Sequence, residues 1–171
     1  DRSKATAYDK DYADRLYREY QNRAVDDTAA LDTLRTAFGG KTVLVLAPGA
    51  SLADETGRNA VAAAKADCIV SANFCPAFCQ PDYAFFTNSK RFEKLDLAAL
   101  PCPVVLTSNL RPLPQGALAV NYDRLAAPDV QNASLGSTSL LMLLRLRRLC
   151  GAKSVLLAGA DGYKAGAPAY A

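Results

Sequence analysis

The 171-residue chain contains no histidine, no tryptophan and a single methionine. Without histidine, it cannot itself supply a Ser-His-Asp triad, a Cys-His pair, an imidazole acid or base, or a histidine-ligated zinc ion. Its net charge is only +3, from 20 basic and 17 acidic residues that are interspersed, which argues against a nucleic-acid partner. No apolar run approaches the roughly 20 residues that cross a bilayer, and no basic-then-apolar signal segment leads the chain. We therefore expect a cytoplasmic protein with no membrane partner.

Half of the residues are hydrophobic and 22% are charged, which is enough apolar material for one packed domain. The five cysteines are odd in number and scattered, so we expect reduced thiols. Cys75 and Cys79 are four apart, which suggests a metal site. Neither a second cysteine pair at zinc-finger distance nor a histidine accompanies them, so we expect buried cysteines that pack as small hydrophobic residues, and no metal.

Residues 1–40 read as a helical arm or linker. Apolar side chains recur there at every fourth position and so fall on one stripe of a helix: Tyr8, Tyr12, Leu16 and Tyr20. Such a stripe either docks onto its own or a neighbouring domain or forms a binding surface. A second helix is expected from Asp26 or Asp27, as N-cap, to Gly39-Gly40. Because Asp1 rather than methionine comes first, we expect a piece of a longer protein.

From Lys41 onward, short β-branched apolar runs alternate with helical segments. Strands are expected over 42–47, 68–73, 83–87, 104–107, 117–120 and 154–158. Helices are expected from Ser51, paired with Asp54 in a capping box, to about 65, then from 89 to about 97 and from 138 to 150. This alternation predicts an α/β fold over residues 41–171: a Rossmann-like, mostly parallel sheet of about six strands with flanking helices, behind the N-terminal helical arm.

Polar residues collect where these strands end, which is where ligands bind in open parallel sheets. The candidates for ligand binding are Gly49, Ala50, Ser51, Asn73, Asn88, Asp161 and Tyr163. The small residues after the first strand would let backbone N–H groups approach a phosphate. The loop is not G-x-G-x-x-G, no acidic residue ends the second strand, and no Gly-Lys-Ser/Thr follows the first, which argues against dinucleotide and P-loop sites.

Each candidate also has a purely structural alternative. Ser51 either caps its helix or meets a phosphate, and Asn73 and Asn88 either bind a ribose or pyrimidine edge or bond their own backbone. Asp161 either holds a metal or caps, and Tyr163 and Tyr170 either donate to a phosphate or pack. We interpret the basic residues late in the 138–150 helix as solvated and as complementing its dipole: Arg145, Arg147 and Arg148.

The ordered motifs resemble, from about Lys41 to Ala171, the nucleotide-binding half of bacterial CMP-sialic acid-dependent sialyltransferases and the related 6-hydroxymethylpterin diphosphokinase-like family. The motifs are Pro48-Gly49-Ala50-Ser51-Leu52, Asn73-Phe74, Phe85-Phe86-Thr87-Asn88, Thr138-Ser139 and Gly159-Ala160-Asp161-Gly162-Tyr163 through Tyr170. The resemblance implies that Asn73 and Asn88 contact the nucleotide donor and that Thr138 and Ser139 lie beside it. It implies that Tyr163 and Tyr170 bind the donor phosphate.

The chain departs from that pattern in ways that bear on activity. Pro48 replaces the loop asparagine, the two tyrosines are one residue further apart, and the family's catalytic histidine has no counterpart. General-base catalysis contributes about 10²–10⁴-fold, so sugar transfer by this chain alone is not expected. The expected ligand is a CMP-like nucleotide or a nucleotide sugar of the cytidine type, bound by a module that is not catalytic on its own and holds no other cofactor.

A further resemblance concerns context. The tyrosine-rich arm and the Ala-Pro-Gly-Ala-Ser loop look like the C-terminal module that follows an HMG-CoA-lyase-like aldolase barrel in some bacterial proteins. It implies that other domains of a parent lyase are partners and that a divalent metal belongs to the barrel. Two alternatives remain: a truncated sialyltransferase-like or pterin diphosphokinase-like transferase, and a structural module that forms homo-oligomers through its arm.

Overall fold

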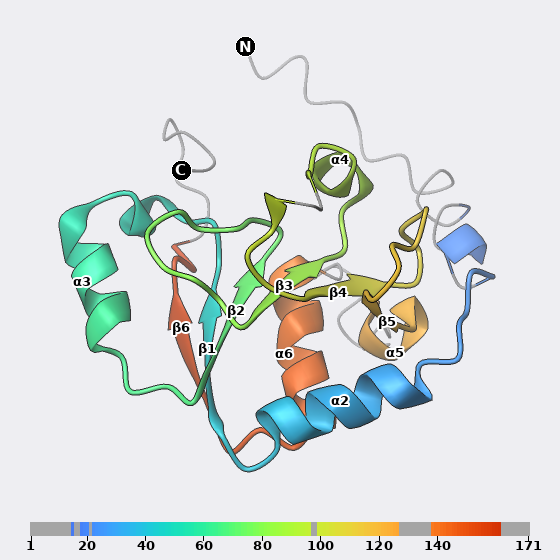
Figure 1. Cartoon of the computed structure of the whole chain (residues 1–171), viewed down its shortest axis with the longest axis horizontal. Coiled ribbons are helices and arrows are strands. Elements are labelled where there is room, and N and C mark those ends of the chain that lie inside the picture. Colours follow the sequence, from blue (N-terminus) through green and yellow to red (C-terminus); the bar gives the residue numbers. More distant parts are fainter. Residues whose placement is uncertain (1–14, 16–17, 21, 97–98, 127–137, 162–171) are drawn as a thin grey trace.

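A six-stranded sheet forms the centre of the molecule in the computed structural model, which describes residues 15, 18–20, 22–96, 99–126 and 138–161 (Figure 1). Its strands are β1 (Thr42–Leu46), β2 (Cys68–Ala72), β3 (Tyr83–Phe86), β4 (Val104–Thr107), β5 (Leu118–Val120) and β6 (Ser154–Ala158). The order is β5-β4-β3-β2-β1-β6, and every neighbouring pair is parallel. This confirms the predicted Rossmann-like α/β fold, with a sheet that is parallel throughout.

Helices cover both faces of this sheet. They are α2 (Thr28–Phe38), the 3₁₀ turn η2 (Ala50–Leu52), α3 (Glu55–Ala63), α4 (Ser89–Phe92), α5 (Tyr122–Ala126) and α6 (Ser139–Leu149). Buried side chains of α2, α5 and α6 share one core with the sheet, while η2, α3 and α4 pack on the opposite face. Among the helices described, none is long and apolar enough to cross a membrane.

Strand β1 shows how the sequence builds these layers. Val43 and Val45 join the core beneath α2 and α6, whereas Leu44 and Leu46 pack against η2 and α3 on the other side. Both faces are therefore buried, which explains the continuous apolar run. Helix α2, expected to belong to the arm, lies in this same core, where Phe38 is fully buried.

Three local predictions differ from the structure. Ser51 does not open a helix by a capping box: α3 begins after Asp54, whose carboxylate accepts a hydrogen bond from the Gly57 amide at 2.7 Å. Helix α4 ends at Phe92 instead of extending to about 97, and the turn that follows lets Phe92 and Leu95 both pack beside β3 and β4. The short helix α5 was not predicted.

Candidate functional site

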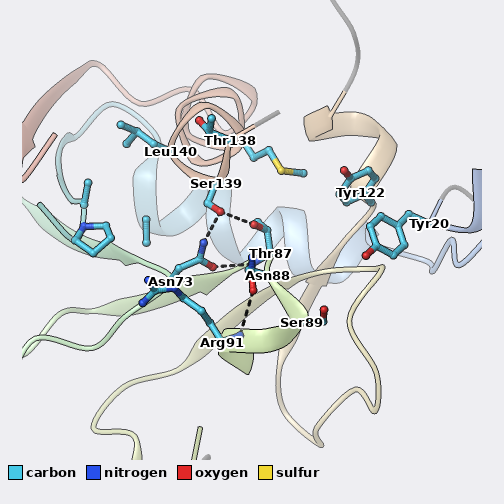
Figure 2. Close-up of a pocket in the computed structure, with 14 residues that line it drawn as sticks. Tyr20, Asn73, Thr87, Asn88, Ser89, Arg91, Tyr122, Thr138, Ser139 and Leu140 are labelled. Atoms are coloured by element: carbon cyan, nitrogen blue, oxygen red, sulfur yellow. Dashed lines mark hydrogen bonds between the residues drawn. The ribbon is translucent and has the colours of Figure 1, made fainter. Parts of the chain in front are cut away.

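A cavity of about 450 Å³ lies at the carboxyl ends of β1, β2 and β3, beneath the start of α6 (Figure 2). Four of the residues proposed from sequence line it: Asn73, Asn88, Thr138 and Ser139. They come from segments that are far apart in the chain, and the parallel sheet brings these segments to one edge. This is the position at which open α/β sheets bind ligands.

Asn73 joins three of these segments. Its backbone has a φ of +60°, a left-handed conformation that asparagine tolerates better than most residues. Its Nδ2 donates to Ser139 Oγ on α6, and its Oδ1 accepts a hydrogen bond from the Thr87 amide after β3 at 3.0 Å. The Thr87 and Ser139 hydroxyls are hydrogen-bonded to each other at 2.6 Å, so a closed polar network forms one wall of the cavity.

Two other lining residues are helix caps. Asn88 Oδ1 accepts from the Arg91 amide at 3.2 Å, and Thr138 Oγ1 accepts from the Leu141 amide at 3.3 Å. The side-chain carbonyl oxygen of Asn88 therefore bonds the local backbone, which was the structural alternative to ligand binding. Its NH₂ group has no hydrogen-bond partner among the described residues.

The cavity is rich in hydrogen-bond donors. At α6, the first N–H groups, those of Ser139 and Leu140, have no carbonyl acceptor within the helix, and both residues line the cavity. Arg91 lines it too and supplies a guanidinium. Helix N-termini carry about half a positive charge, so the start of α6 and Arg91 together favour an anionic ligand group.

Other residues proposed for the site form a separate cluster at the β1–β6 edge and do not line the cavity. Ser51 donates from its amide to Asp161 Oδ2 and from its hydroxyl to Asp161 Oδ1, each at 2.6 Å. Ala50 is exposed, and Gly49 packs against Gly159 so closely that a Cβ would overlap the Gly159 carbonyl oxygen. In the structure, Asp161 thus ties the end of β6 to the loop after β1. Tyr163 and Tyr170 lie outside the described residues.

The prediction that the arginines of α6 are solvated is wrong for Arg145. Its Nη1 donates to the Leu125 carbonyl of α5 at 2.6 Å, and the side chain is half-buried. Arg147 is also half-buried, whereas Arg148 is exposed. The packing of α6 against α5 accounts for the difference, because it brings the Arg145 guanidinium to the Leu125 carbonyl, which lies in the last turn of α5 and has no donor within that helix.

All five cysteines are free thiols. Cys68 and Cys150 are buried in the core beside α2 and α6, as expected for small hydrophobic residues, whereas Cys75, Cys79 and Cys102 are only half-buried. Burial raises the pKa of Cys68 to about 12 and that of Cys150 to about 11. Within the described part of the chain, no group of three or more cysteine, aspartate or glutamate residues could hold a metal ion.

Alkylation of Cys102 is expected to show an unusual pH profile. Burial, followed by the neighbouring Cys75, raises its pKa from 9.0 to about 11. Because only the thiolate reacts, the rate should rise about tenfold per pH unit up to pH 10. In the urea-unfolded chain, the alkylation rate of the same cysteine should stop rising near pH 9. Peptide mass spectrometry after timed iodoacetamide exposure measures both rates, and identical profiles would contradict the prediction.

Several lining residues were not proposed as ligand-binding residues: Tyr20, Pro48, Thr87, Ser89, Arg91 and Tyr122. Thr87 and Pro48 belong to motifs noted in the sequence, and Tyr20 to the tyrosine stripe, so a signal existed for these three. No feature of the sequence indicated that Arg91 or Tyr122 would line the cavity. Their placement depends on how α4 and α5 pack beside the strand ends.

No family model, no curated protein and no solved structure matches this chain. The resemblance to sialyltransferase-like domains therefore rests on the short motifs alone. What the structure adds is a parallel α/β sheet with a polar cavity at its carboxyl edge, lined by residues from four of those motifs: Pro48, Asn73, Thr87, Asn88, Thr138 and Ser139.

Proposed function

We propose that this chain is a binding module for a nucleotide or nucleotide sugar of the cytidine type, and that its site is the cavity at the carboxyl ends of β1, β2 and β3. The observation that carries the proposal is the convergence of Asn73, Asn88, Thr138 and Ser139 on this one cavity. Its volume of about 450 Å³ lies within the roughly 300–1,000 Å³ typical of small-molecule sites.

The chemistry of the walls supports an anionic ligand with a sugar or base. The first N–H groups of α6 and the Arg91 guanidinium suit a phosphate. The free NH₂ group of Asn88 suits an acceptor atom of a ribose or pyrimidine. The cytidine preference itself rests on the resemblance of the motifs.

The module is proposed to bind and not to catalyse on its own. The general base that the resemblance implies is a histidine, and the chain has none. Following the resemblance in context, the proposed setting is a larger aldolase- or lyase-type enzyme whose chemistry belongs to other domains.

Calorimetric titration of the chain with CMP, CDP, AMP and cytidine tests the proposal. We expect CMP and CDP to bind more tightly than cytidine, because the phosphate meets Arg91 and α6, and more tightly than AMP. If none of the four ligands gives a heat of binding at millimolar concentration, the assignment is overturned. Equal binding of CMP and AMP would remove the cytidine preference.

Replacing Asn88 with aspartate is expected to weaken CMP binding at least tenfold while leaving stability almost unchanged. Aspartate caps a helix as well as asparagine does, so α4 keeps its cap. The change removes the free NH₂ donor and places a negative charge in a cavity that is proposed to bind an anion. Asn59→Asp, on an exposed position of α3, is the matched control and should bind CMP as the wild type does. Unchanged affinity in Asn88→Asp would place the ligand elsewhere.

A further inference from the structure

Two tyrosines that are far apart in the sequence meet at one end of the cavity. Tyr20 belongs to the N-terminal arm and Tyr122 begins α5, and both line the cavity. Their ring centroids are 5.1 Å apart with the planes at 68°, an edge-to-face pair. In Figure 2 the two rings lie on the far side of Thr87 and Asn88 from Asn73, so the cavity has an aromatic end and a polar end.

The residues that follow Tyr20 are held in place by contacts that also position Tyr122. Asn121, the residue before Tyr122, accepts from the Val25 amide and donates to the Val25 carbonyl, both at 2.8 Å. Arg23 donates to the Asn109 carbonyl at 2.7 Å, and its guanidinium lies 6.0 Å from the centroid of the Tyr20 ring. The Tyr122 amide donates to Ser108 Oγ at 3.0 Å. Both rings are therefore fixed to one scaffold by the paired hydrogen bonds between Asn121 and Val25.

We propose that the Tyr20–Tyr122 pair is the subsite for the planar ring of the ligand, and that the helical turn carrying Tyr20 is thereby part of the binding site. This inference rests on the proposed function, because it needs a ligand with an aromatic base. Stacking on an aromatic side chain suits a base without needing matched hydrogen bonds. With the base at this end, the phosphate lies toward Arg91 and the start of α6, where the donors are.

The test compares variants at Tyr20, which lies at the edge of the fold. Tyr20→Ala is expected to weaken CMP binding about 5- to 100-fold, the usual cost of losing one stacked base. Tyr20→Phe keeps the ring and should bind within about twofold of the wild type. Arg18→Ala, an exposed position in the same helical turn, is the matched control and should be unchanged.

A purely structural role for Tyr20 is excluded by measuring how firmly the neighbouring Val25 is held. Hydrogen exchange at the Val25 amide reports its bond to Asn121, and it should be equally slow in Tyr20→Ala and the wild type. Because the chain has no tryptophan, Tyr20→Trp adds a single reporter whose fluorescence should change on CMP addition.

The outcomes separate the two proposals. If the wild type binds no nucleotide, the proposed function fails and this inference fails with it. If the wild type binds CMP and Tyr20→Ala binds equally well, only this inference fails. It also fails if Tyr20→Phe loses as much affinity as Tyr20→Ala, or if the Val25 amide becomes unprotected in Tyr20→Ala.

Discussion

Replacing Gly159 with alanine is expected to destabilise the fold by about 2–5 kcal/mol. Gly159 follows β6 with a φ of +70°, a conformation that costs a residue with a Cβ about 1–2 kcal/mol. An added Cβ would also overlap the carbonyl oxygen of Ala47 and lie 2.8 Å from Leu52 Cδ1. Overpacking of this kind typically costs a further 1–3 kcal/mol, because backbone at the β1–β6 edge has to shift.

Gly40→Ala separates the two contributions. Gly40 has nearly the same φ, +69°, but an added Cβ would meet nothing within 4 Å. It should therefore cost only the conformational part, about 1–2 kcal/mol. Urea unfolding of both variants gives the difference. Equal losses would mean that the close approach of the β1 and β6 loops is not rigid.

The parallel sheet could be predicted because each strand is a short run of β-branched and other apolar residues bounded by polar or small residues. Val43 to Leu46 is buried on both sides, so its sequence shows no alternation and reads as an interior strand. The end of α6 could also be predicted from the sequence, because Gly151 directly follows the helical segment. In the structure this residue has a φ of +74°, which glycine readily adopts.

The caps and the cavity walls could be predicted only in part. Ser51 and Asp54 have the spacing of a capping box. Ser51 instead donates its hydrogen bonds to Asp161, a partner 110 positions away that no local pattern indicates. Asn73 and Asn88 were found because strand ends of a parallel sheet share an edge. The walls supplied by Arg91 and Tyr122 depend on the packing of two short helices, which periodicity does not predict.

The contribution of Gly49 was predicted for the wrong structural reason. A small residue after β1 suggested a phosphate loop, and in the structure the space beside Gly49 is filled by the Gly159 carbonyl and the Asp161 carboxylate. Glycine is favoured at this position in two situations: where the loops after two strands cross closely, and where a phosphate approaches the backbone. Only the position of β6 distinguishes them.

Replacing Asn73 with alanine is expected to cost about 2–4 kcal/mol and to disrupt the cavity. The change removes the hydrogen bonds to Ser139 Oγ and to the Thr87 amide, each worth about 0.5–1.5 kcal/mol. It also forces alanine into a left-handed backbone conformation, at about 1 kcal/mol relative to asparagine. If the proposed function is right, CMP affinity should fall in parallel, because β2, β3 and α6 are no longer joined at the cavity wall.

Asn73→Gly distinguishes the amide from the backbone. Glycine accepts a φ of +60° without strain, so it should cost about 1 kcal/mol less than alanine while losing the same hydrogen bonds. A double-mutant cycle with Ser139→Ala should give a coupling of about 1 kcal/mol, since the two side chains are directly bonded. Strict additivity would mean that the hydrogen bond from Asn73 to Ser139 contributes nothing to holding α6 over the strand ends, and the polar network would then not be what shapes the cavity.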